Sequence, residues 1–163
     1  MSLSKLSLLA VAATLAFSGA AAHADSLTLG NTGQSMSFFL NGFQQGSGGN
    51  YTPSSAVIGG KSVVFTAVYC VDLNDEINDN TTYNNTLFTT NGNVNGSTVT
   101  NAAKIAWLIL NTTVTNSTQA AGLQAAIWET EYGNAFSLIT GGSIASDESA
   151  DLSALSHGTV TNS

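Results

Sequence analysis

The chain has 163 residues, with ten acidic side chains, three lysines, no arginine and a formal net charge of −7. Such a surface repels phosphate backbones and anionic lipids, which disfavours binding to nucleic acid or to a membrane surface. The length suits one domain with a real core, and the single cysteine excludes an intrachain disulfide.

An export signal is predicted at the N-terminus. Lys5 supplies a positive charge, residues 6–17 form a short uncharged apolar run, and residues 22–24 (Ala-His-Ala) are a small-x-small cleavage site. A membrane anchor needs about 20 apolar residues, and this run is too short. We therefore expect residues 1–24 to be a signal peptide and the mature protein to be secreted or held at the cell surface, with no membrane span after cleavage.

The first half of the mature chain reads as β-structure. Residues 26–43 alternate weakly and are broken by Gly-Asn-Thr-Gly, which predicts two strands, and residues 44–55 read as a loop. The strongest predicted strand covers residues 61–73, rich in β-branched and aromatic side chains. Period-two alternation along it puts Cys70 near its end, on the same mixed face as Val64.

Two helices are predicted later in the chain. Residues 101–110 begin with a capping Asn and carry apolar side chains at helical spacing. The second helix begins at Ser117 or the next residue and ends at Gly133, a residue suited to a C-cap. A short strand is expected at 136–139, with a further possible helix at 147–155.

These elements predict an α+β fold, with an antiparallel β-sheet or sandwich and two helices inserted in the second half. We expect residues 25–145 to form the functional domain. Residues 146–163 read as a polar tail that ends abruptly, as in a truncated chain.

Cys70 and Gln124 are the candidate chemical residues. Gln124 lies inside the apolar stripe of the second helix, where an amide without hydrogen bonds would cost about 1–3 kcal/mol. Taken singly, Gln124 reads as a core-edge amide bonded to a loop and Cys70 as a small buried hydrophobe. Taken together, they are the residue types of a γ-glutamyl thioester, in which a thiolate attacks a carboxamide and expels ammonia. The stripe consists of Ala120, Leu123, Ile127 and Trp128.

Two motifs resemble the bacterial thioester domain family. Residues 69–72 (Tyr-Cys-Val-Asp) look like its aromatic-Cys-aliphatic strand, and residues 123–129 (Leu-Gln-Ala-Ala-Ile-Trp-Glu) look like its hydrophobic-Gln-x-Ala-Ile-Trp helix. Residues 106–108 (Ala-Trp-Leu) are similar to a segment of exported Gram-negative relatives, which typically carry a C-terminal PEP sorting tag (PEP-CTERM type). The resemblance covers residues 63–132, and no PEP tag is visible in the chain.

The resemblance implies an internal thioester in which Cys70 is the thiol and Gln124 the acyl donor, with Tyr69 and Trp128 as shielding neighbours. It further implies covalent attachment to amines on a target surface. Acidic residues beside the cysteine would slow thioester formation or attract a cationic amine. These residues are Asp72, Asp75, Glu76 and Asp79.

The leading functional prediction is a secreted, adhesin-like protein that attaches to an amine of a surface or matrix protein or polysaccharide. Because each molecule would react once, it is not expected to be an enzyme, and no cofactor or metal is expected. The alternative is a structural protein of the extracellular matrix or biofilm that binds without a covalent bond and has an inert Cys70.

A third reading is a Ca²⁺-stabilised carbohydrate-binding module that uses Trp107, Tyr83 or Tyr51. Its candidate Ca²⁺ site is the oxygen-rich stretch of residues 72–80, which lacks the glycine and glutamate of an EF-hand loop and reads more readily as a solvated polar loop. His157 would be the only histidine left after cleavage, which argues against a Ser-His-Asp triad.

Overall fold

The computed structural model describes residues 8–9, 22–46, 50–74, 77–88, 92–94 and 97–160. The chain forms two compact units: unit 1 is Met1–Asn31 with Tyr51–Val99, and unit 2 is Thr32–Asn50 with Thr100–Ser163. Antiparallel sheets occur together with helices from the second half of the chain, which confirms the predicted α+β class. Among the described residues, no helix is long and apolar enough to cross a membrane.

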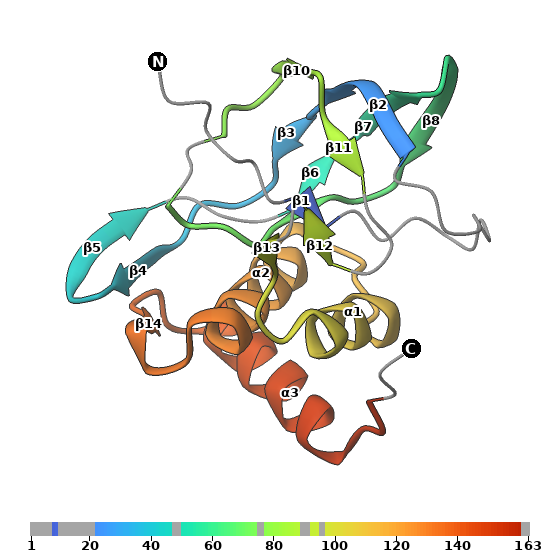
Figure 1. Cartoon of the computed structure of the whole chain (residues 1–163). Coiled ribbons are helices and arrows are strands. Elements are labelled where there is room, and N and C mark those ends of the chain that lie inside the picture. Colours follow the sequence, from blue (N-terminus) through green and yellow to red (C-terminus); the bar gives the residue numbers. More distant parts are fainter. Residues whose placement is uncertain are drawn as a thin grey trace. The chain divides into compact units, whose positions relative to one another are not determined.

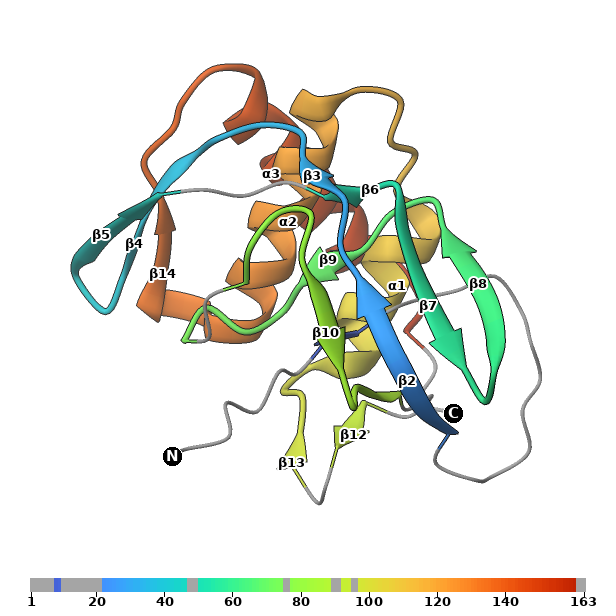
Figure 2. The ribbon, with the colours of Figure 1, turned by 90° about the horizontal axis from the view of Figure 1, so that it is seen from above.

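Unit 1 is built on an antiparallel sheet with the strand order β10-β2-β7-β8 (Figure 2). Strand β11 also pairs with β2. Leu27 of β2 lies opposite Ala56 of β7. Residues paired in this way point to the same face of the sheet, and both side chains are buried. The strands are β2 (Ala22–Thr28), β7 (Ser54–Ile58), β8 (Lys61–Phe65), β10 (Thr82–Asn84) and β11 (Leu87–Phe88).

Several short strands complete this part of the chain. They are β1 (Leu8–Leu9), which pairs with β9 (Tyr69–Cys70), β6 (Tyr51–Thr52), and the pair β12 (Asn93–Val94) and β13 (Ser97–Thr98). The two-residue β3 (Asn31–Thr32) falls where the sequence passes from unit 1 to unit 2. Strand β1 lies inside the predicted signal peptide and β2 begins two residues before its predicted end, and cleavage after Ala24 stays a prediction.

The expected single strand over residues 61–73 is wrong. Strand β8 ends at Phe65, Thr66 and Ala67 belong to no strand, and β9 contains only Tyr69 and Cys70. Residues 68–71 are all buried, a pattern that alternation along one strand surface does not produce. Cys70 therefore does not share a face with Val64, which is exposed.

Unit 2 contains three helices and an antiparallel sheet with the order β14-β4-β5 (Figure 1). The helices are α1 (Ala102–Asn111), α2 (Ser117–Tyr132) and α3 (Ser143–His157), with a short 3₁₀ turn, η1 (Gly133–Ala135), after α2. The strands are β4 (Ser37–Leu40), β5 (Phe43–Gly46) and β14 (Phe136–Leu138). Of the two strands expected within residues 26–43, one is therefore in each unit.

The two predicted helices are confirmed, and their ends have clear causes. At the start of α2, the Asn116 side chain accepts a hydrogen bond from the Gln119 backbone N–H at 2.9 Å, which is an N-cap. At its end, Gly133 has a φ of 54°, which favours glycine. Asn101 is the N-cap residue of α1, as predicted, but its side chain makes no capping hydrogen bond and instead donates to the Thr130 carbonyl at 2.8 Å.

Residues 143–157 form a third helix, longer than the possible helix expected at 147–155. Much of the segment expected as a polar tail thus belongs to α3. Only Ile144 and Glu148 of this helix are buried, which explains why the sequence carries a weak apolar pattern there.

Candidate functional site

The centre of unit 2 is α2, whose residues 120–128 are all buried. A helix buried on every side packs against neighbours all round, and small residues at five of these positions allow close approach. Gln124 is 0% exposed within this segment, so its carboxamide lies in an apolar layer. The predicted apolar stripe around Gln124 is confirmed.

Helical geometry separates two faces of α2. Each residue turns the helix by about 100°, so Gln124 lies about 200° from Gly122 and nearly opposite it. Gly122 faces α3, since a Cβ there would lie 2.5 Å from the Asp147 Cβ. Trp128 is four residues after Gln124 and therefore shares its face, away from α3.

An aromatic cluster covers that face. The Trp128 ring lies 4.9 Å from the Phe38 ring of β4 and 6.0 Å from the Phe136 ring of β14, measured between centroids. Phe38 and Phe136 are 5.4 Å apart, and all three rings are tilted against one another, a favourable arrangement. The Trp128 Nε1 is buried without a hydrogen-bond partner in the described part of the chain.

Cys70 lies in unit 1, in the buried stretch of residues 68–71. Its side chain is 8% exposed, and Sγ donates to the Asp72 backbone carbonyl at a sulfur–oxygen distance of 3.0 Å. This hydrogen bond orients the thiol on its own loop.

Backbone pairing with Tyr51 holds the stretch that leads to Cys70. The Tyr51 N–H donates to the Val68 carbonyl at 2.9 Å, and the Val68 N–H donates back at 3.3 Å. The buried Ser54 hydroxyl donates to the Tyr51 carbonyl at 3.0 Å and accepts from the Gly30 N–H at 3.1 Å. A Cβ on Gly30 would lie 2.2 Å from the Pro53 carbonyl oxygen, so only glycine fits there.

Negative charge surrounds this part of unit 1. Burial, and then the charges of Cys70, Asp79 and Tyr83 in their ionised forms, hold the pKa of Tyr51 well above its ordinary value. The Asp72 carboxylate accepts hydrogen bonds from the Asn74 backbone and side chain at 2.8 and 3.2 Å. Asp72 therefore stabilises its own loop, while Asp75 and Glu76 of the predicted acidic cluster lie outside the described residues.

All four predicted site residues are buried. Cys70 and Tyr69 lie in unit 1 and Gln124 and Trp128 in unit 2. Apolar surroundings slow hydrolysis of a thioester, and they suit both proposed partners of the bond. The bond between Cys70 and Gln124, and the shielding roles of Tyr69 and Trp128, stay predictions.

Each aromatic residue of the carbohydrate-binding alternative is buried or half-buried. Tyr51 is buried, the Tyr83 hydroxyl accepts from the Asn78 N–H at 2.8 Å, and Trp107 packs against Gly158. Across the described ranges, no group of three or more His, Cys, Asp or Glu side chains could hold a metal ion.

Sequence reasoning missed the partners that surround the candidate residues. Alternation in residues 37–40 indicates that Phe38 is buried, but no local signal places its ring on Trp128. Glu148 was also missed, although it stands four residues after the buried Ile144 on the same helix face.

The chain matches a known protein family. A model of the thioester domain family matches residues 67–157, which is more than half of the chain and includes both Cys70 and Gln124. Searches of curated proteins and of solved structures found no match. The chain belongs to the thioester domain family.

Proposed function

We propose that this protein is exported and uses an internal thioester between Cys70 and Gln124 to attach itself covalently to amines on a surface or matrix partner. The observation that carries the proposal is the family match, which spans both residues. Family membership supports the coarser statement that the chain is a thioester-bearing protein that attaches covalently to a nucleophile.

The chemistry proceeds in two balanced steps. The Cys70 sulfur adds to the side-chain carbonyl carbon of Gln124 and the thiol proton passes to the amide nitrogen. The C–N bond then breaks, and ammonia leaves as the C–S bond is retained. An amine of the partner then attacks the same carbon, the C–S bond breaks, and the thiol is regenerated as an amide links the two molecules. Each molecule reacts once, so the protein is not an enzyme in the sense of turnover.

Burial supports formation and retention of the thioester, which is the first step. Gln124 is fully buried and Cys70 nearly so, which keeps water from an activated acyl group. The predicted signal peptide supports export, and the Ala-Trp-Leu segment at 106–108 supports a relation to exported PEP-CTERM-type members. We therefore place the protein outside the cytoplasm, in an adhesin-like role.

Intact-mass measurement of the purified mature protein tests the thioester. We expect a mass about 17 Da below the calculated value, because one ammonia is lost when the thioester forms. Methylamine should then restore the mass of the uncyclised chain plus the difference between methylamine and ammonia. Cys70→Ala and Gln124→Asn should each show their calculated masses and no reaction with methylamine.

Circular dichroism of the two variants supplies the control for folding. Loss of the mass deficit in variants with an unchanged spectrum assigns the deficit to these two side chains. The calculated mass in the wild type, together with a thiol that iodoacetamide alkylates without unfolding, would instead favour the non-covalent matrix protein with an inert Cys70.

A further inference from the structure

Helix α3 lies against α2 at backbone distance. A Cβ on Gly122 of α2 would lie 2.5 Å from the Asp147 Cβ, 3.1 Å from the Glu148 backbone nitrogen and 3.2 Å from the Ile144 carbonyl oxygen. Only a glycine allows this contact. It brings the acidic side of α3 directly onto α2.

Only two side chains of α3 are buried. Ile144 is the one large apolar side chain of α3 that is buried, and the other buried residue is Glu148, which is 8% exposed. Burial of a carboxyl group stabilises a helix contact only when the group is neutral or well paired. The attachment of α3 therefore depends on the state of Glu148.

Glu148 meets a second carboxyl group from α2. The two side chains of Glu148 and Glu129 form a hydrogen bond, while the Glu148 Oε1 atom is buried without a hydrogen-bond partner among the described residues. Two carboxyl groups hydrogen-bond only when one of them carries a proton. Burial and then the Glu129 charge raise the pKa of Glu148 to about 7.

The other charges of unit 2 offer no compensation close to this pair. Asp151 accepts a hydrogen bond from the Thr112 hydroxyl at 3.1 Å, and burial raises the pKa of Asp151 as well. Glu131 accepts from the Thr100 N–H at 3.1 Å. The remaining titratable groups on these helices are Asp147, which raises the pKa of Asp151, Tyr132 on α2, Lys104 in the first turn of α1 and His157 in the last turn of α3.

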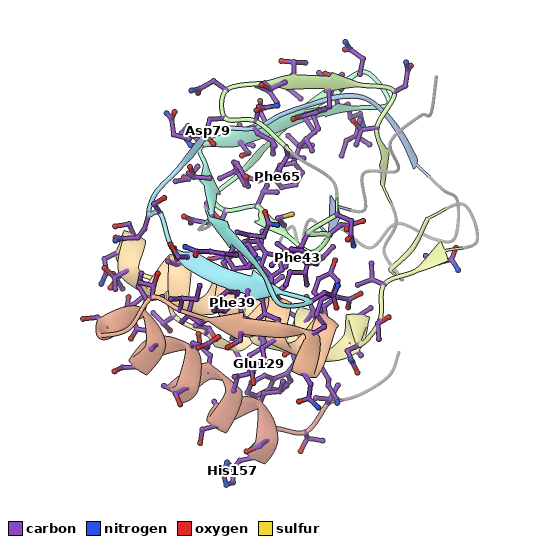
Figure 3. The ribbon with its side chains drawn as sticks, turned by 90° about the vertical axis from the view of Figure 1, so that its left-hand side faces the viewer. Phe39, Phe43, Phe65, Asp79, Glu129 and His157 are labelled. Atoms are coloured by element: carbon purple, nitrogen blue, oxygen red, sulfur yellow. The ribbon has the colours of Figure 1, made fainter. Side chains whose placement is uncertain are left out.

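Lys104 and His157 are the two groups of unit 2 that can be cationic, and neither contributes to the pKa of Glu148. Both are exposed. Figure 3 shows His157 at the end of α3, away from Glu129. Ionised Glu148 would thus face Glu129 without a cation to offset the repulsion.

We propose that Glu148 and Glu129 form a proton-dependent latch that holds α3 on α2 while the two carboxyl groups share a proton, and that loosens when both are ionised. The proposal concerns unit 2 alone and does not depend on a thioester. It makes α3 the element of the fold whose attachment responds to pH.

The direction follows from proton linkage. In released α3, Glu148 titrates at its ordinary pKa of 4.5, whereas in the docked helix the pKa is about 7. The docked state therefore binds the extra proton between these values, and docking weakens as pH rises through that window. Docking is tightest below pH 4.5 and levels off above pH 7, and the full shift corresponds to at most about a 300-fold change in the docking constant.

Hydrogen–deuterium exchange of the full mature chain, read by mass spectrometry, tests the latch. We expect the protection of residues 143–157 to fall by tens to hundreds of fold between pH 4.5 and pH 7.5, after correction for the intrinsic exchange rate. Glu148→Gln keeps a hydrogen-bond donor and removes the charge, so the change in its protection with pH should be much smaller, with Asp151 accounting for what remains. Peptides from α1 serve as the internal reference.

Two further variants sharpen the result. Glu129→Gln changes an exposed residue that tolerates substitution, and it should reduce the pH dependence even if Glu148→Gln does not fold. Glu131→Gln removes the same charge from the same helix and should leave the pH dependence unchanged. Protection of α3 that is independent of pH in the wild type, or an undiminished fall in Glu148→Gln, would overturn the proposal.

Discussion

Two polar side-chain groups lie in the apolar layer of α2. Gln124 carries a carboxamide at 0% exposure, and Trp128 carries an N–H that is buried without a partner in the described structure. Such groups lower stability by about 1–3 kcal/mol when they lack hydrogen bonds. Of the two, the Trp128 N–H is the one buried without a partner among the described residues.

The orphaned indole N–H leads to a prediction for Trp128. Replacing Trp128 with Phe should lower the free energy of unfolding by only about 1–2 kcal/mol, because the cavity is small and no hydrogen bond is lost. Trp128→Ala should lower it by about 3–5 kcal/mol, since the rings of Phe38 and Phe136 lose their partner. Denaturant unfolding followed by circular dichroism measures both.

The same pair of variants separates packing from shielding. If Trp128 shields the proposed thioester through its ring, Trp128→Phe should keep the mass deficit for nearly as long as the wild type, and Trp128→Ala should lose it faster to water. A cost above about 3 kcal/mol for Trp128→Phe would mean that the N–H does make a hydrogen bond.

At the scale of elements, the contact between α2 and α3 depends on one missing side chain. Gly122→Ala should lower the free energy of unfolding by about 2 kcal/mol or more, because its Cβ would overlap the Asp147 Cβ at 2.5 Å. This loss exceeds the gain of about 1 kcal/mol that alanine brings to a helix interior. Thermal unfolding measured by calorimetry checks the sign.

Gly141 provides the matched control, because a Cβ there would meet nothing within 4 Å. Gly141→Ala should leave the melting temperature nearly unchanged. Equal effects of the two substitutions would show that α3 does not depend on close approach at Gly122.

Strand β8, which ends at Phe65, is shorter than its local sequence pattern predicts. Residues 61–73 are rich in β-branched and aromatic side chains, yet the chain leaves the sheet at Thr66. The hydrogen bonds between Tyr51 and Val68 then fix a separate, fully buried stretch around Cys70. A pairing with a distant segment is not visible in the alternation of one strand.

At the scale of the whole molecule, the net negative charge is the property that most affects which nucleophile can approach. The predicted cleavage after Ala24 would remove Lys5, leaving ten acidic residues against Lys61 and Lys104 and moving the net charge from −7 to −8. A field of this sign attracts cationic nucleophiles and repels anionic ones.

The charge predicts a salt dependence of amine capture. The proposed thioester should couple 1,3-diaminopropane, which keeps a second positive charge, several-fold faster at low ionic strength than at 0.5 M salt, where screening acts over about 4 Å. Coupling of the singly amino-substituted 2-methoxyethylamine should change much less. Mass spectrometry of the products over time gives both rates, and equal salt dependence would exclude steering by the protein's charge.

The sequence alone determined the α+β class, the two helices at 101–110 and 117–133, the family, and the burial of Gln124, because these depend on short-range periodicity, capping and motif spacing. Only the tertiary structure decided the division into two units, the break after Phe65, the aromatic rings around Trp128 and the carboxyl pair of Glu129 and Glu148. The physical reason is that each of these depends on contacts between residues far apart in the chain, and long-range contacts leave no period in the local sequence.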